Sequence, residues 1–182
     1  IILGVVQGLT EFLPVSSSGH LEITRELLDS NQLPSDNLLM TSVLHFATAL
    51  STILVFRKDI YDLIKGLFDK ENKTSKSYVI KILISIVPAG LVGFLLSDEI
   101  EFLFSGNMTL VGIMLIITGT LLFLTKILKT KNFKISKVHA LIIGLSQAFA
   151  VIPGISRSGA TICTSLFLGN NKSEAAKFSF LI

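Results

Sequence analysis

Charged side chains, cysteine and tryptophan are scarce in this sequence. Only 16% of the 182 residues are charged, tryptophan is absent, and Cys163 is the single cysteine. One cysteine excludes a disulfide within the chain, and the apolar neighbours of Cys163 indicate a packing role. Against 50% hydrophobic residues, the low charge content excludes an ordinary soluble domain. It indicates a helical protein that crosses a membrane several times.

The pattern of a secretory leader is missing as well. The N-terminal residues lack a basic segment, and Glu11 and Pro14 interrupt their apolar run, so we expect no signal peptide here. The chain begins without methionine and ends within an apolar run, residues 175–182. We therefore expect a fragment of a longer protein, with a single membrane domain over residues 1–182.

Three apolar segments are long enough to cross a bilayer as helices, which takes about 20 residues. They are residues 38–56, 79–97 and 108–125. The segments around them differ in charge, and the positive-inside rule places basic loops in the cytoplasm and acidic loops outside. The basic loops are residues 57–78 and 126–138, and the acidic loops are residues 21–37 and 98–107. The net charge of +3 therefore reflects membrane orientation, and we expect no nucleic-acid partner.

One sequence pattern occurs twice, 140 positions apart. GVVQGLTEFLPVSSSGH at residues 4–20 aligns with GLSQAFAVIPGISRSGA at residues 144–160. Each copy is an apolar helix too short to span, followed by a proline and a turn rich in serine and glycine. Three predicted spans separate the copies, so the first enters the membrane from outside and the second from the cytoplasm.

This arrangement predicts an all-α polytopic membrane protein with an inverted-topology repeat. Two re-entrant helix-turn-helix hairpins would meet near the midplane of the bilayer. Repeat one covers residues 1–138, and repeat two begins over residues 139–182 with a hairpin and the start of a span.

The two turns carry polar groups that are costly inside a membrane and therefore indicate function. Arg157 offers a planar fork of donors suited to phosphate. Ser17 and His20 are three residues apart, which suits a nucleophile with a base, or an orienting hydroxyl with an acid. Glu11 ends the first short helix and can hold Mg²⁺ or Ca²⁺. Together these groups indicate a site for a lipid-linked phosphate or diphosphate, with further hydroxyls from Ser16, Ser18, Ser156 and Ser158.

EFLPVSSSGH at residues 11–20 and PGISRSGAT at residues 153–161 resemble the two signature motifs of the undecaprenyl-diphosphate phosphatases, the bacitracin-resistance proteins. FRKDI and AAKFSFLI also resemble family segments, so the likeness covers essentially the whole chain. It implies an enzyme that hydrolyses undecaprenyl diphosphate to undecaprenyl phosphate and phosphate, recycling the lipid carrier of cell-wall synthesis. It also implies a divalent metal and a site opening to the outer side of the bacterial plasma membrane.

The resemblance further implies roles for individual residues. Glu11, Ser17, His20 and Arg157 would be catalytic, and Glu11 would also hold the metal. Many family members carry glutamate where this chain has Gln7, so Glu11 must supply most of the metal site. The residues implied to bind substrate are Gln7, Ser16, Ser18, Ser156, Ser158 and Thr161.

Several alternatives stay open at this stage. The nucleophile could be Ser17, His20 or a water molecule. A lipid-phosphate flippase or transporter would use the same anion site without hydrolysis, and a membrane scaffold would need no polar turns. Glu11 and Arg157 could also form a purely structural ion pair. We assign His45 and His139 to packing or to the membrane interface. The expected partners are a polyprenyl diphosphate and membrane lipid, and a homodimer is compatible with the sequence.

Overall fold

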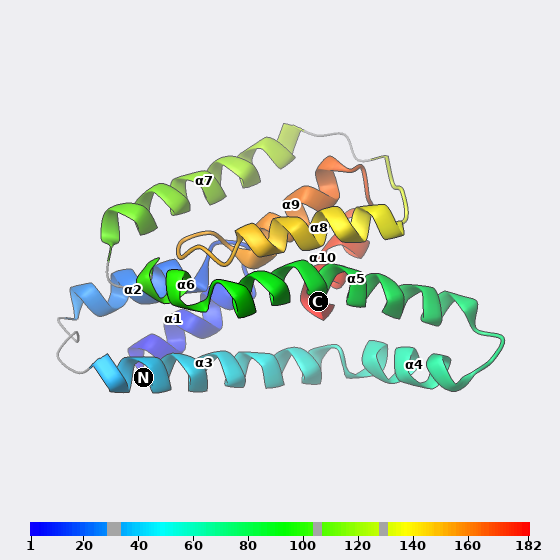
Figure 1. The fold of residues 1–182 in the computed structure, drawn as a ribbon, viewed down its shortest axis with the longest axis horizontal. Coiled ribbons are helices and arrows are strands. Elements are labelled where there is room, and N and C mark those ends of the chain that lie inside the picture. Colours follow the sequence, from blue (N-terminus) through cyan, green and yellow to red (C-terminus); the bar gives the residue numbers. More distant parts are fainter. Residues whose placement is uncertain (29–33, 104–106, 128–130) are drawn as a thin grey trace.

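The computed structural model describes residues 1–28, 34–103, 107–127 and 131–182 (Figure 1). These residues form helices joined by turns, with one isolated parallel bridge between Phe133 and Asn170. The described helices are α1 (Ile2–Glu11), α2 (Ser17–Leu27), α3 (Pro34–Val55), α4 (Arg57–Phe68), α5 (Lys73–Leu95), α6 (Ser97–Leu103), α7 (Met108–Ile127), α8 (Lys137–Phe149), α9 (Arg157–Phe167) and α10 (Lys172–Leu181).

Two of the described helices, α5 and α7, are long and apolar enough to cross a membrane. Helices α3 and α4 satisfy the same criterion only as a pair, because the chain bends by 71° between Leu39–Val55 and Arg57–Phe68. The structure thus confirms an all-helical protein with two or three candidate spans. Helix α5 continues through Pro88.

The prediction that residues 57–78 form a loop is wrong for most of that stretch, because α4 occupies Arg57–Phe68. Apolar residues recur there every three or four positions, as at Ile60, Ile64 and Leu67, and that helical period is easily overlooked among the charges. An ion pair between Asp59 and Lys177 ties α4 to α10. The acidic loops are likewise partly helical, since they contain most of α2, the start of α3, and α6.

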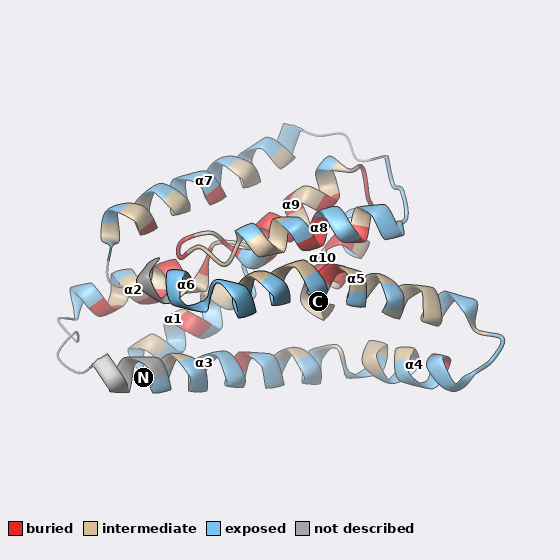
Figure 2. Ribbon diagram, in the orientation of Figure 1, coloured by how far each residue is buried: buried red, intermediate tan, exposed pale blue. Residues whose placement is uncertain are grey.

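The most extensive contact between the described helices lies between α5 and α8. Gly144 lies so close to α5 that an added Cβ would be 2.5 Å from the carbonyl oxygen of Ser85. Ser85, Ala140 and Ile143 are fully buried at or beside this contact. Figure 2 shows that buried residues gather around α8, α9 and α10, whereas most of α3, α5 and α7 is exposed or half-buried.

The exposed residues of the long helices include large apolar side chains. Phe46 on α3, Phe94 on α5 and Ile116 on α7 are all exposed. Such surfaces are unfavourable in water, but hydrocarbon chains of lipid accommodate them without cost. These helix faces therefore fit a position against lipid.

Two helix-turn-helix units, α1–α2 and α8–α9, place their turns next to each other at the centre of the fold. Each second helix begins with a serine cap: Ser16 accepts a hydrogen bond from the Gly19 amide at 3.3 Å, and Ser156 accepts one from Gly159 at 2.9 Å. Such caps satisfy amides that have no partner within the helix. The two capped helix starts are thereby fixed in direction.

Thr118 on α7 holds the second turn in place. Its hydroxyl donates to the carbonyl oxygen of Gly154 at 3.2 Å and accepts from the amide of Ser156 at 3.2 Å. Gly154 has a φ of +93°, and an added Cβ there would lie 2.7 Å from the carbonyl oxygen of Val111. Glycine is required at this position both by the backbone conformation and by the close approach of α7.

Candidate active site

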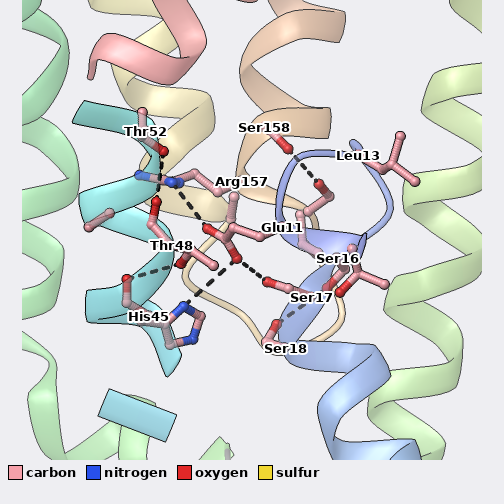
Figure 3. A pocket seen from close by; sticks show the side chains of 15 residues that line it. Glu11, Leu13, Ser16, Ser17, Ser18, His45, Thr48, Thr52, Arg157 and Ser158 are labelled. Carbon is pink, nitrogen blue, oxygen red and sulfur yellow. Dashed lines mark hydrogen bonds and ion pairs between the residues drawn. The ribbon is translucent and has the colours of Figure 1, made fainter. Parts of the chain in front are cut away.

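A cavity of about 350 Å³ lies where the two turns meet α3 (Figure 3). Its walls come from the end of α1, the start of α2, one face of α3, and the start of α9. Most of the lining groups are hydroxyls, with one carboxylate, one imidazole and one guanidinium among them. The lining residues are Thr10, Glu11, Leu13, Ser16, Ser17, Ser18, His45, Thr48, Ala49, Thr52, Ala150, Ile155, Ser156, Arg157 and Ser158.

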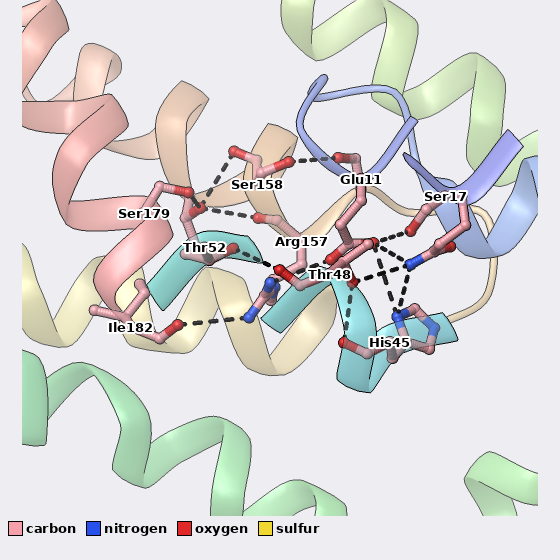
Figure 4. A network of polar contacts seen from close by, with 12 residues as sticks. Glu11, Ser17, His45, Thr48, Thr52, Arg157, Ser158, Ser179 and Ile182 are labelled. Carbon is pink, nitrogen blue, oxygen red and sulfur yellow. Dashed lines mark hydrogen bonds and ion pairs between the residues drawn. The ribbon is translucent and has the colours of Figure 1, made fainter. Parts of the chain in front are cut away.

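Glu11 is the centre of the polar network (Figure 4). Its Oε2 accepts a short hydrogen bond from the Ser17 hydroxyl, at 2.5 Å, and another from Gln7 Nε2, at 3.0 Å. Its other oxygen, Oε1, lies 3.5 Å from Nη2 of Arg157. The carboxylate thus joins a hydroxyl from the first turn to a cation from the second.

Both capped helices point their N-terminal ends at the cavity. The start of α2 contributes Ser16, Ser17 and Ser18 to the lining. The start of α9 contributes Ser156, Arg157 and Ser158. A helix N-terminus carries unpaired amides and a partial positive charge, which together favour an anion. With the guanidinium added, the cavity is suited to a phosphate group.

His45 is the residue that the sequence analysis missed. It was assigned to packing or to the membrane interface, but it lines the cavity, and its Nδ1 lies 3.1 Å from Gln7 Nε2 and 3.8 Å from Glu11 Oε2. Thr48 and Thr52 line the cavity from the same face of α3, three and seven positions further on. This polar spacing within an apolar helix was the available signal. His139, in contrast, lies outside the cavity and bonds to Asn170 Oδ1 at 2.8 Å.

Seven of the ten predicted site residues line the cavity. They are Glu11, Ser16, Ser17, Ser18, Ser156, Arg157 and Ser158.

Gln7, His20 and Thr161 are not among the lining residues. Gln7 is buried behind Glu11 and contacts it directly. The ring of His20 bonds through Nδ1 to the carbonyl oxygen of Ser16 at 2.7 Å. Thr161 is buried, and its hydroxyl contacts Ser179 at 2.6 Å.

The predicted pairing of Ser17 with His20 therefore receives no support from the described contacts. The hydroxyl of Ser17 is bonded to Glu11, and the described bonds of His20 run to its own chain neighbourhood. A three-residue spacing brings two side chains to neighbouring positions on a helix without making them touch. Here the acceptor of the Ser17 proton is a carboxylate instead of an imidazole.

The predicted metal can be tested against the side chains at the cavity that could bind a metal ion. Among the described residues, no group of three or more His, Cys, Asp or Glu side chains could enclose a metal ion. Glu11 is the one carboxylate in the cavity lining. Behind it, the Oε1 oxygen of Gln7 is buried and has no hydrogen-bond partner among the described residues. Because Gln7 turns its amide nitrogen toward Glu11, the cavity offers Mg²⁺ or Ca²⁺ one carboxylate, and a substrate and water would supply the remaining oxygen ligands.

Comparison with known proteins gives a consistent picture over the whole chain. The chain is 54% identical over 182 residues to an undecaprenyl-diphosphatase of Christiangramia forsetii, covering all of this chain and 69% of the relative. It is 48% identical over 183 residues to an undecaprenyl-diphosphatase of Bacteroides fragilis, covering 68% of that protein. A Methanococcus vannielii undecaprenyl-diphosphatase is 44% identical over 186 residues, with 72% of it covered. The family model described as bacitracin resistance protein BacA matches residues 1–182, and the chain therefore belongs to that family.

Proposed function

We propose that this protein is a membrane-bound undecaprenyl-diphosphatase, which hydrolyses undecaprenyl diphosphate to undecaprenyl phosphate and inorganic phosphate. The reaction returns the lipid carrier to cell-wall synthesis. Family membership over the whole chain and relatives of that name support the activity. The observation that carries it is the cluster of Ser17, Glu11 and Arg157 in one cavity.

The chemistry follows from these three groups. Ser17 Oγ attacks the terminal phosphorus of the diphosphate and gives its proton to Glu11 Oε2, to which it is already bonded at 2.5 Å. The bond between that phosphorus and the bridging oxygen breaks, and undecaprenyl phosphate leaves. The proton that Glu11 took from Ser17 then passes to solvent, which restores the carboxylate. Water attacks the phosphorus of the phosphoserine and gives a proton to Glu11. The bond between phosphorus and Ser17 Oγ breaks, Ser17 Oγ takes that proton from Glu11, and inorganic phosphate leaves.

Arg157 and the two helix starts stabilise the charge that develops on the phosphoryl oxygens. The guanidinium is held 3.5 Å from Glu11, so it faces the position where the phosphoryl group would be transferred. Fixed donors of this kind supply most of the rate enhancement in phosphoryl transfer. The geometry favours Ser17 as nucleophile over His20, whose ring is bonded to the Ser16 carbonyl outside the cavity lining. Direct attack by water, with Glu11 as base, is the remaining alternative.

We also propose a divalent metal, Mg²⁺ or Ca²⁺, which Glu11 would hold together with substrate oxygens and water. Such an ion neutralises negative charge on a diphosphate. Within the chain itself, Arg157 performs the same task, and Gln7 orients Glu11 through its amide nitrogen.

For the membrane arrangement we propose the inverted repeat, with repeat one over residues 1–138 and repeat two beginning at 139–182. The matching serine caps and neighbouring turns of α1–α2 and α8–α9 support it. The positive-inside rule supports a site that opens to the outer side of the plasma membrane. The homodimer stays a prediction.

The test is phosphate release from undecaprenyl diphosphate by purified protein in detergent, with and without EDTA. We expect release from the wild type and loss on chelation. For the variant Ser17→Ala the matched control is Ser51→Ala. Ser51 is exposed on α3, and its hydrogen bond among the described residues runs to the Ala47 carbonyl of its own helix. Wild-type protein that moves the lipid across vesicles without releasing phosphate would establish the flippase instead.

A further inference from the structure

Gln7 lies between Glu11 and His45, and its orientation is set by chemistry. An ionised carboxylate accepts hydrogen bonds and cannot donate them, so the amide nitrogen of Gln7 must face Glu11 Oε2, 3.0 Å away. The same nitrogen lies 3.1 Å from Nδ1 of His45. It also lies 3.4 Å from the hydroxyl oxygen of Thr48, a longer contact, so Glu11 and His45 are the nearest acceptors for the two amide protons.

This arrangement fixes the tautomer of His45. Because Nδ1 accepts a proton from Gln7, it carries none itself, and the ring proton of the neutral imidazole is on Nε2. Nδ1 of His45 lies 3.8 Å from Glu11 Oε2. With no proton on Nδ1, these two atoms do not bond to each other, and both accept from the Gln7 amide instead. Nε2–H has no hydrogen-bond partner among the described residues, and the side chain is 43% exposed where it lines the cavity.

The other polar groups of α3 cannot offer the same donor. The hydroxyl of Thr48 donates to the carbonyl oxygen of His45 at 3.0 Å. The hydroxyl of Thr52 donates to the carbonyl oxygen of Thr48 at 3.0 Å. Their protons are thus committed to the helix backbone. Among the cavity-lining residues of α3, His45 is the one whose side-chain N–H has no acceptor among the described residues.

We infer that His45 binds the substrate by donating its Nε2–H hydrogen bond to a diphosphate oxygen, and that Gln7 holds the ring in the required tautomer. The inference rests on the proposed function, because it names a further contact for the same substrate. A third element, α3, thereby joins the two turns in holding the anion. The identity of residue 7 matters for the same reason, since a glutamate there would not present an N–H to His45.

Two variants separate this role from a structural one. In His45→Gln the amide nitrogen reaches the position of Nε2, which keeps the donor into the cavity and loses the acceptor for Gln7. In His45→Asn the short side chain lies near the position of Nδ1, which keeps a partner for Gln7 and loses the donor. The measurements are KM and kcat for undecaprenyl diphosphate and the inhibition constant of methylenediphosphonate, a diphosphate that cannot be hydrolysed.

We expect His45→Asn to raise KM and the inhibition constant by about 10- to 100-fold, the usual worth of a hydrogen bond to a charged group. His45→Gln should recover most of that loss, with both values clearly closer to those of the wild type than the values of His45→Asn. The reverse order, with His45→Asn normal and His45→Gln impaired, would show that His45 only supports Gln7. Unchanged constants in both variants would also overturn the inference.

A second measurement needs no variant of His45. The chain has three histidines, so ¹⁵N-histidine-labelled wild-type protein gives a short set of signals. Those of His20 and His139 are identified by replacing each residue in turn. We expect His45 to show the tautomer protonated at Nε2, with that signal shifting on addition of methylenediphosphonate. A proton on Nδ1, or an unmoved signal at saturation, would contradict the inference even if the wild type released no phosphate.

Discussion

The two helix-turn-helix units share a backbone plan and differ in the chemistry that they present. In both units a serine caps the second helix, and its hydroxyl contacts the hydroxyl of the serine two residues later. The two oxygens are 3.2 Å apart in Ser16 and Ser18, and 3.3 Å apart in Ser156 and Ser158. The first helical position is Ser17 in one unit and Arg157 in the other. One plan thus delivers the proposed nucleophile from one side and a cation from the other.

The units also touch each other at equivalent glycines. A Cβ on Gly19 would lie 3.2 Å from the Cα of Gly154 in the second turn, and a Cβ on Gly159 would lie 3.0 Å from the carbonyl oxygen of Pro14 in the first. Each helix start therefore rests on the backbone of the opposite turn. We therefore expect the distance between Glu11 and Arg157 to depend on these two contacts.

The two helix-turn-helix units differ in backbone conformation at the serine that caps the second helix. Ser16 has a φ of 68°, in the left-handed region that a residue with a Cβ rarely adopts, whereas Ser156 has an ordinary φ of −75°. Backbone strain of this kind is typical of functional sites. In the second unit the left-handed position falls on Gly154, which adopts it without penalty. The strained turn is the one that carries Ser17, the proposed nucleophile.

The largest effect should come from removing the two residues that distinguish the units. We expect Ser17→Ala and Arg157→Ala each to lower kcat by at least about 10³-fold, because one removes the attacking group and the other the main cation. Arg157→Lys should recover part of the loss, since it restores charge without the planar fork. Single-turnover phosphate release measures the effect. Near-normal rates in Ser17→Ala would favour direct attack by water.

A smaller effect should follow from separating the units. In Gly159→Ala the new methyl group would press on Pro14 and Ser156, so the turns must move apart by a few tenths of an ångström. We expect activity to fall by about 10- to 100-fold, because catalysis is sensitive to small misplacements. Gly90→Ala is the control, as nothing lies within 4 Å of its added Cβ. Equal activity in the two variants would mean that this contact does not set the geometry.

The smallest effect should distinguish the two caps. Ser16→Gly loses the cap hydrogen bond but relieves the left-handed strain, so we expect it to leave stability unchanged or to raise it. Ser156→Gly loses its cap with no strain to relieve, and should lower stability by a few tenths of a kcal/mol. Thermal unfolding in the same detergent compares the two. A larger loss in Ser16→Gly than in Ser156→Gly would show that strain at Ser16 is unimportant.

Local signals account for the parts of this fold that the sequence predicts well. The short helices, the prolines that follow them and the serine caps are each encoded within a few residues, and the repeat shows that the two turns belong together. Residues 57–68 were mistaken for a loop because charge masked a helical period. The length and the apolar composition of a helix decide whether it is a candidate span, and both can be read from the sequence. The predicted spans 79–97 and 108–125 therefore agree with α5 and α7.

The details of the site depend on packing, which local patterns do not encode. A lone histidine in an apolar span carries no sign of its neighbours, and His45 enters the cavity only because α3 packs on α1. Spacing suggested that Ser17 meets His20, but the cap directs Ser17 toward Glu11 and the His20 ring to the Ser16 carbonyl. Thr161 similarly bonds to the Arg157 carbonyl of its own helix, at 2.9 Å, and does not reach the cavity.

The contact between Glu11 and Arg157 makes the resting cavity electrically balanced. Each charge alone would cost about 2.5–3.5 kcal/mol at the bilayer centre, and the opposite charges offset much of that cost for each other. An arriving diphosphate competes with Glu11 for the guanidinium. Once the phosphate oxygens hold Arg157, Glu11 is left with its hydrogen bonds from Ser17 and Gln7. The substrate would thereby take over the part of counter-charge that the carboxylate fills in the empty pocket.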